Sequence, residues 1–160
     1  MRETTLCYLS KNDCYLMLHR VKKKNDANHD KWIGVGGGLL ENETPRECAI
    51  REVWEETGYT MHSPVYRGIV NFYSTDYEDE VMHIFTSNQF SGEQIDCNEG
   101  VLAWVPISQV PNLPGWEGDR IFLTLLATDA PFFHLSLYYE KDNLVKAILN
   151  KEELSLPFQQ

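Results

Sequence analysis

The stretch GGLLENETPRECAIREVWEETGY, residues 37–59, decides the fold of this 160-residue chain. Thr44 and Glu47 form a capping box, and Pro45 suits the first position of a helix. Gly58 can adopt the left-handed conformation that commonly ends helices. The sequence therefore predicts a helix that runs from the proline to the residue before this glycine.

Three glutamates share one face of the predicted helix. Glu52, Glu55 and Glu56 stand at positions i, i+3 and i+4, where side chains are neighbours. Like charges at this spacing repel one another, and the adjacent Arg51 is the one nearby cation in sequence. Such a face is commonly just solvated. Alternatively, it holds a hard divalent cation, because Mg²⁺ and Mn²⁺ prefer oxygen ligands.

A glycine-rich loop before the helix favours the metal-binding interpretation. Gly36, Gly37 and Gly38 allow the backbone to approach a ligand closely. Two common phosphate-loop patterns do not fit, since Leu39 replaces the third glycine of a dinucleotide fingerprint and no Gly-Lys-Ser/Thr follows. A capped helix at a fixed distance from this loop predicts a site for metal ions and phosphates.

The composition is typical of one globular domain, and we expect a single domain over residues 1–160. Hydrophobic residues make up 42% of the chain, which is enough for a core. The formal net charge of −10 argues against binding to a nucleic-acid polymer. The N-terminal residues lack a signal-peptide pattern and no apolar run could span a membrane, so we expect a cytoplasmic protein without membrane partners. The four cysteines form no CxxC pair and are expected to be reduced.

The rest of the chain predicts a mixed sheet with two helices packed on it. An apolar repeat at helical spacing predicts the second helix from about Glu117 to Ala127. The strands that we expect are Thr4–Ser10, Cys14–His19, Val65–Ser74, Val81–Phe90, Val101–Val105, Phe132–Glu140 and Leu144–Asn150. The basic segment Arg20–Lys24 is expected to be a solvated loop, with a phosphate contact as the alternative.

The glycine loop and the glutamate helix together resemble the Nudix box of the Nudix hydrolases. Its defining positions are filled by Gly37, by Glu43 after five intervening residues, and by the run 51–59 after seven more. Tyr59 is larger than the aliphatic residue that is usual at that position. The resemblance implies the α/β class, with a Nudix-type α/β/α sandwich and a mixed central sheet. It also implies hydrolysis of a nucleoside diphosphate linked to another moiety, with Mg²⁺ as the cofactor or Mn²⁺ as its substitute.

The resemblance further implies roles for individual residues. Its catalytic positions correspond to Glu43, Arg51, Glu52, Glu55 and Glu56. All three helix glutamates and the Gly36 carbonyl are expected to contact metal. Glu52 is expected to be the base, although carboxylates coupled around a metal can exchange roles. Arg51 and Glu43 are expected to orient the loop and the helix.

Most of the chain outside the box is similar to the MutT-type enzymes, which hydrolyse oxidised purine nucleoside triphosphates. Glu99 matches a loop glutamate that adds a metal contact or assists the base, with a solvated acidic loop as the alternative. Trp116 matches a tryptophan that stacks on the purine, and Asp119 matches an aspartate that recognises its edge. Their alternatives are a core anchor and a carboxylate favoured at a helix start. The expected substrate contacts are Gly37, Gly38, Trp116 and Asp119.

Two positions depart from the MutT-type pattern. Gly38 stands where a lysine usually follows the paired glycines, so one phosphate-side cation is missing. Ile33 stands where some relatives have an asparagine that hydrogen-bonds the base, and an apolar residue cannot replace that contact.

The function that we expect is hydrolysis of oxidised purine nucleoside triphosphates such as 8-oxo-dGTP to the nucleoside monophosphate and pyrophosphate. The protein would act in nucleotide-pool sanitation, as a monomer or a homodimer. One alternative is a Nudix hydrolase of ADP-ribose, a dinucleoside polyphosphate or a pyrimidine triphosphate. The other is a non-catalytic nucleotide sensor with the same fold.

Overall fold

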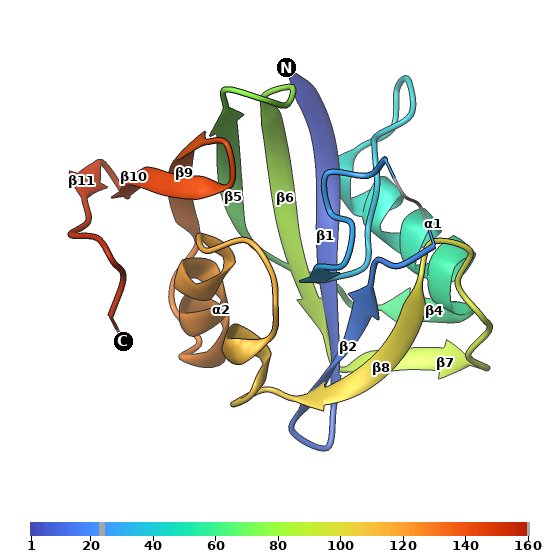
Figure 1. Ribbon diagram of the computed structural model, residues 1–160. Helices are drawn as coiled ribbons and strands as arrows, with labels where there is room; N and C mark the ends of the chain where they lie inside the picture. Colours follow the sequence, from blue (N-terminus) through green and yellow to red (C-terminus); the bar gives the residue numbers. More distant parts are fainter. Residues whose placement is uncertain (23–24, 160) are drawn as a thin grey trace.

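A large mixed sheet organises the computed structural model, which describes residues 1–22 and 25–159 (Figure 1). Its strands are β1 (Arg2–Lys11), β2 (Cys14–His19), β3 (Trp32–Ile33), β5 (Val65–Ser74), β6 (Glu80–Ser87), β8 (Val101–Pro106), β9 (Phe133–Glu140), β10 (Asn143–Leu149) and β11 (Glu152–Glu153). They are ordered β11-β10-β9-β5-β6-β1-β2-β3, and β8 also pairs with β2. The pairs β1–β6 and β5–β9 are parallel, while β1–β2 and β5–β6 are antiparallel. The predicted mixed sheet is confirmed.

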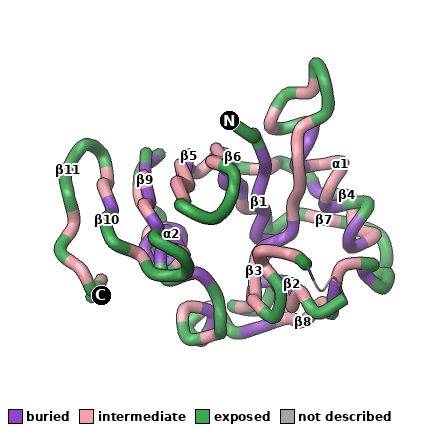
Figure 2. Tube along the Cα trace, turned by 45° about the horizontal axis from the view of Figure 1, so that its top comes forward, coloured by how far each residue is buried: buried purple, intermediate pink, exposed green. Residues whose placement is uncertain are grey.

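Strand β1 separates two apolar clusters. Leu6 and Tyr8 point into one cluster, and Cys7 and Leu9 point into the other, because successive side chains of a strand alternate between the faces of its sheet. The first cluster includes helix α2 (Asp119–Ala127), and the second includes helix α1 (Pro45–Thr57). The helices therefore cover opposite faces, which is the predicted α/β/α sandwich. Figure 2 shows the resulting burial, with β1 largely buried and the outermost strand β11 exposed.

Helix α1 begins and ends at the predicted residues. The Thr44 hydroxyl accepts a hydrogen bond from the Glu47 N–H at 3.1 Å, and the Glu47 carboxylate accepts one from the Thr44 N–H at 3.0 Å. Gly58 has a φ of 82° and donates to the Trp54 carbonyl. A Cβ at Gly58 would lie 2.3 Å from the Glu93 carbonyl oxygen, so this position requires glycine. The helix is thus fixed by its own ends.

Some predicted element bounds were wrong. The strand predicted over Val81–Phe90 is divided, since β6 ends at Ser87 and strand β7 (Gln89–Gly92) pairs instead with β4 (Tyr59–His62). The Ser87 hydroxyl donates to the His62 carbonyl at 2.6 Å and accepts from the Gln89 N–H, which breaks the sheet pairing there. The second helix begins two residues later than predicted. The sequence did not predict the short elements β4, β11 and η1 (Val110–Asn112), because they are too short to show a periodicity.

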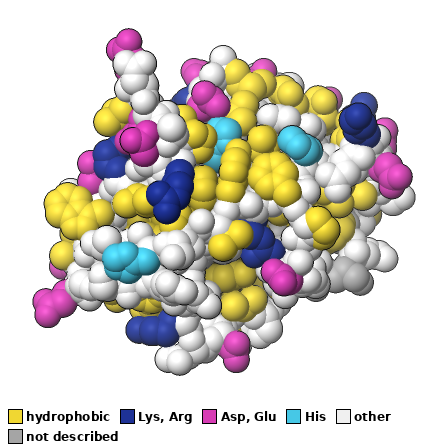
Figure 3. Space-filling view, turned by 180° about the vertical axis from the view of Figure 1, so that it is seen from behind, with side chains coloured by type: hydrophobic (Ala, Val, Ile, Leu, Met, Phe, Trp, Pro, Cys, Tyr) yellow, Lys and Arg dark blue, Asp and Glu magenta, His cyan; other side chains and the backbone are white. Residues whose placement is uncertain are grey.

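Two further predictions concern the chain as a whole. All four cysteines are free thiols, as predicted. In the described part of the chain, no helix has both the length and the apolar character needed to cross a membrane. Seen from behind, Lys and Arg side chains are scattered singly between hydrophobic and acidic ones (Figure 3).

Candidate active site

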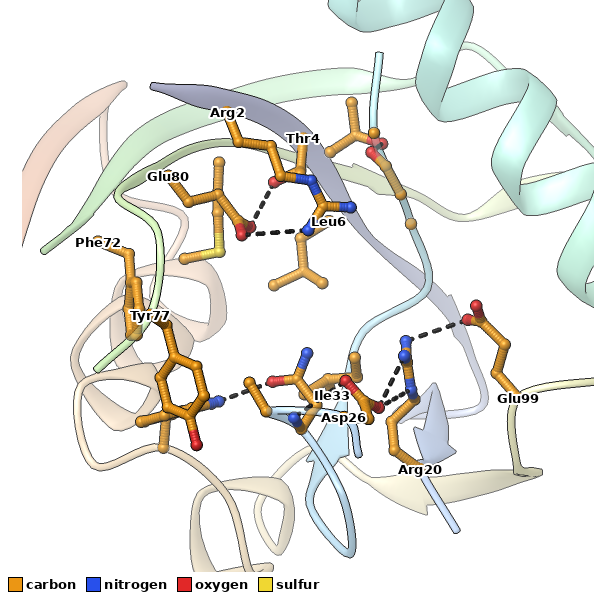
Figure 4. Close-up of a pocket in the computed structure, with 18 of the residues that line it drawn as sticks. Arg2, Thr4, Leu6, Arg20, Asp26, Ile33, Phe72, Tyr77, Glu80 and Glu99 are labelled. Atoms are coloured by element: carbon orange, nitrogen blue, oxygen red, sulfur yellow. Dashed lines mark hydrogen bonds and ion pairs between the residues drawn. The ribbon is translucent and has the colours of Figure 1, made fainter. Parts of the chain in front are cut away.

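A cavity of about 760 Å³ brings together most of the predicted site residues. It is lined by parts of β1, the glycine loop, α1, β5 and β6, and by the segment that leads into α2. The predicted residues that line it are Gly36, Gly37, Gly38, Glu52, Glu56, Glu99, Trp116 and Asp119. Figure 4 shows side chains from these segments around one open space. Glu43, Arg51 and Glu55 are not among the residues that line it.

Arg51 connects Glu43 and Glu55 to the residues that line the cavity. Its guanidinium donates to both carboxylate oxygens of Glu43, at 2.7 and 2.9 Å. It also donates to Glu52 at 2.8 Å and to Glu55 at 3.1 Å. A further hydrogen bond of 3.1 Å reaches the Gly38 carbonyl oxygen, so one cation holds the glycine loop and the helix together. Because the guanidinium is a rigid fork with five donors, it can hold all these groups at once.

The glycine loop lies in direct contact with the glutamates. The Gly36 N–H donates to the Glu56 carboxylate at 3.1 Å. A Cβ at Gly37 would lie 2.5 Å from the carboxyl carbon of Glu52, and a Cβ at Gly36 would lie 1.9 Å from the Thr5 carbonyl oxygen. Gly36 therefore excludes any side chain because backbone stands in the way, while a side chain at Gly37 would displace the Glu52 carboxylate.

The carboxyl groups at this end of the cavity have strongly perturbed acidities. Burial first, then a hydrogen bond with Glu99 and the charges of Glu99 and Glu52, together raise the pKa of Glu56 to about 9 against the lowering effect of the Gly36 N–H. Burial also raises the pKa of Glu52, while Arg51 opposes that shift. Negative charge is therefore costly here unless a cation is added.

The donor groups at this end fit a hard divalent cation. Glu52, Glu56 and Glu99 offer carboxylate oxygens, and the Gly36 carbonyl belongs to the loop beside them, which is the ligand type that Mg²⁺ and Mn²⁺ prefer. A cation would also offset the repulsion that raises the pKa of Glu56. Over residues 1–22 and 25–159, no three acidic, histidine or cysteine side chains already stand close enough to hold a metal.

Arg20 is a site residue that the sequence prediction missed. Its side chain is 12% exposed and forms ion pairs with Asp26 at 2.7 Å and with Glu99 at 3.0 Å. The expectation of a solvated segment is therefore wrong for Arg20, because two carboxylates on the cavity wall hold it inward (Figure 4). Lys23 and Lys24, at the end of the same segment, lie outside the described residues.

The other end of the cavity is largely aromatic and apolar. Trp116 is only 8% exposed, and its indole N–H donates to the Asn28 side-chain oxygen at 2.7 Å. Trp116 thus belongs to the core, as the alternative prediction holds, and it also lines the cavity, while its stacking on a purine stays a prediction. Burial raises the pKa of Asp119 to about 7, and Lys31 opposes the shift. Ile33, the predicted departure, lines the same cavity.

Comparison with known proteins defines the class to which this fold and site belong. A sequence model of the NUDIX domain matches residues 2–126. The chain is 26% identical over 144 residues to the uncharacterized Nudix hydrolase YvcI of Bacillus subtilis, and the match covers 87% of each chain. It is 29% identical over 133 residues to an oxidized purine nucleoside triphosphate hydrolase of Danio rerio, covering 82% of this chain and 85% of the relative.

A solved structure supports the same class. The crystal structure of a MutT protein from Bacillus halodurans superposes with a TM-score of 0.85 at 24% identity, covering 95% of this chain and 99% of the other. At that identity the likeness shows the fold. The chain belongs to the Nudix family. It is a Nudix hydrolase with a MutT-like fold, and enzymes of this family generally use divalent metal ions.

Proposed function

We propose that this protein hydrolyses oxidised purine nucleoside triphosphates, such as 8-oxo-dGTP, to the nucleoside monophosphate and pyrophosphate. The observation that carries the proposal is the division of one cavity into two chemically different ends. Glycines and carboxylates line one end, while Phe72, Trp116 and Asp119 line the other. A volume of about 760 Å³ suits a ligand of nucleotide size.

The aromatic end supports a purine substrate. An indole at the wall can stack on a base, which contributes about 1–3 kcal/mol per base. Asp119 stands beside Trp116 on the cavity wall and can exchange hydrogen bonds with the edge of the base. The 29% identity to an oxidized purine nucleoside triphosphate hydrolase agrees with this substrate class.

The carboxylate end supports attack by water on an internal phosphorus. We assign Glu52 as the base and Glu55, Glu56, Glu99 and the Gly36 carbonyl as metal ligands, and Glu52 can also share in the binding of metal. Arg51 and Glu43 hold these groups in place through the hydrogen bonds described above. A bound Mg²⁺, or Mn²⁺ in its place, supplies neutralisation of phosphate charge and lowers the pKa of bound water.

Strands β9, β10 and β11 follow the family match yet continue the same sheet, which supports a single domain over residues 1–160. We propose that the protein acts in the cytoplasm in nucleotide-pool sanitation, as a monomer or a homodimer. Carboxylates and phosphates repel each other, so the phosphates would bind at this end together with metal ions. The proposed partner is therefore a metal-bound nucleoside triphosphate rather than a nucleic-acid polymer.

A hydrolysis panel tests the proposal. The purified protein is incubated with 8-oxo-dGTP, dGTP, dCTP, a dinucleoside polyphosphate and ADP-ribose, with Mg²⁺ or Mn²⁺, and products are separated by ion-exchange chromatography. We expect the highest kcat/KM for 8-oxo-dGTP, with a monophosphate and pyrophosphate as products. A preference for ADP-ribose or another panel member would replace the substrate. Tight binding of one nucleotide without hydrolysis of any would support the non-catalytic sensor.

A further inference from the structure

The cation that is missing at Gly38 has a spatial replacement. A Cβ built on Gly38 would lie 3.6 Å from Nη2 and 3.9 Å from Nε of Arg2, at the start of β1. The Arg2 guanidinium thus occupies the space next to the position from which a lysine would project. Gly38 itself lies at the carboxylate end of the cavity, since Arg51 binds its carbonyl oxygen.

Strand pairing explains how Arg2 reaches this place. The parallel register of β1 and β6 sets Arg2 opposite Glu80 and Thr4 opposite Met82. The Thr4 hydroxyl donates to the Glu80 carboxylate at 2.7 Å, and the other Glu80 oxygen lies 3.7 Å from Arg2 Nη1. Figure 4 shows the Arg2 guanidinium turned over the cavity between Glu80 and the glycine loop. Glu80 therefore positions the arginine.

The charge balance of the cavity makes this cation important. Among the described residues that line it, seven are acidic and two, Arg2 and Arg20, are basic. Arg20 is occupied by close ion pairs with Asp26 and Glu99. Arg2 makes one longer ion pair, and its side chain is 57% exposed. Its guanidinium can therefore turn to a ligand with little loss of existing contacts.

We propose that Arg2 binds the phosphate chain of the substrate and replaces the lysine that is missing at Gly38. The inference rests on the proposed function, because it assigns one contact of the phosphate-bearing substrate. Guanidinium groups bind phosphate oxygens in pairs of parallel hydrogen bonds, so the replacement suits the ligand chemically. The cation projects from strand β1 and not from the glycine loop, but it reaches the same part of the cavity.

The direct test measures binding of inorganic tripolyphosphate with Mg²⁺ by isothermal titration calorimetry. The Arg2→Ala variant should bind it about tenfold more weakly than the wild type, the loss typical of one charge-assisted contact. Arg46→Ala is the charge-matched control, because Arg46 is exposed on α1 and does not line the cavity. We expect it to bind tripolyphosphate as the wild type does.

A rescue variant separates a phosphate contact from a structural role. Gly38 has no left-handed φ, and a Cβ there meets no atom closer than 3.6 Å, so Gly38→Lys is sterically allowed. We expect Arg2→Ala/Gly38→Lys to recover most of the lost affinity. With 8-oxo-dGTP, Arg2→Ala should raise KM while kcat changes little.

The outcomes distinguish this inference from the proposed function. Wild-type affinity for tripolyphosphate in Arg2→Ala, equal losses in Arg2→Ala and Arg46→Ala, or a double variant that recovers nothing would each overturn the role of Arg2. If Arg2→Ala alone failed to fold, Arg2→Gln would replace it, and an unchanged affinity for tripolyphosphate in Arg2→Gln would overturn the role as well. Failure of the wild type to hydrolyse 8-oxo-dGTP would reject the proposed substrate, whereas tripolyphosphate binding would still report on Arg2.

Discussion

The two ends of the cavity are built in different ways. At the carboxylate end, Arg51, Glu52, Glu55 and Glu56 come from one helix that directly follows the glycine loop, and the capping box and Gly58 fix where that helix begins and ends. Glu99 joins them from a distant loop. At the aromatic end, Phe72 comes from β5, Ile33 from β3 and Trp116 from the segment before α2. The first end is centred on one helix and the loop before it, whereas the second exists only when the whole sheet has formed.

This difference separates reaction chemistry from substrate selection. The carboxylate end carries the groups proposed to bind metal and activate water, so substitutions there should affect turnover of every substrate. The aromatic end depends on side chains from distant segments, so substitutions there should alter the preference among substrates. Each of the following variants tests one side of this comparison.

Glu56→Gln should produce the largest effect, a loss of kcat/KM of about 10³-fold on every substrate that the protein hydrolyses. The amide can still accept the Gly36 N–H, but it cannot ionise to bind a metal ion. Steady-state kinetics with Mg²⁺ measures the loss. Because the buried carboxylate is costly, the melting temperature should not fall.

The control for this variant is Glu41→Gln, which removes a glutamate that is exposed and does not line the cavity. It should keep the wild-type rate. Near-normal turnover in Glu56→Gln, or a loss confined to one substrate, would contradict the assignment of Glu56 to the common chemistry.

Arg51→Lys should reduce kcat/KM by about 10²-fold and destabilise the fold by about 2 kcal/mol. A single ammonium group cannot bind Glu43, Glu52, Glu55 and the Gly38 carbonyl together, as the guanidinium does. Kinetics and urea denaturation measure the two effects. If activity fell without any loss of stability, Arg51 would not hold the loop and helix together as the geometry indicates.

The same contrast explains how much the sequence could predict. Helix α1 was predicted correctly because Thr44, Pro45 and Gly58 mark its ends locally, and the shared face of the glutamates follows from helical spacing alone. The ion pairs of Arg20 with Glu99 and of Arg2 with Glu80 join residues that are far apart in sequence. No local pattern encodes such pairs, since they depend on strand order and register.

Ile33→Asn should change substrate preference with little effect on the common chemistry. The added amide supplies a hydrogen-bonding group to an apolar part of the cavity wall, and one such bond is worth about tenfold in relative kcat/KM. The ratio of kcat/KM for 8-oxo-dGTP and dGTP is the measurement, and Ile33→Leu is the apolar control. Equal changes for both substrates would show that Ile33 does not contact the base.

Asp119 should contribute the smallest effect, a dependence of stability on pH that belongs to the aromatic end. Burial raises its pKa from 3.8 to about 7, so between these values the folded protein keeps a proton that the unfolded chain releases. Stability from this group is therefore complete at low pH and declines as pH rises towards 7. Relative to Asp119→Asn, the wild type should lose a few degrees of melting temperature, about 4 °C, between pH 5 and pH 7.5. Glu56 is present in both proteins, so its own titration cancels in the difference. Parallel melting curves over this range would mean that Asp119 is ionised and solvated, and then the aromatic end would lack the protonated carboxyl that can donate to a base.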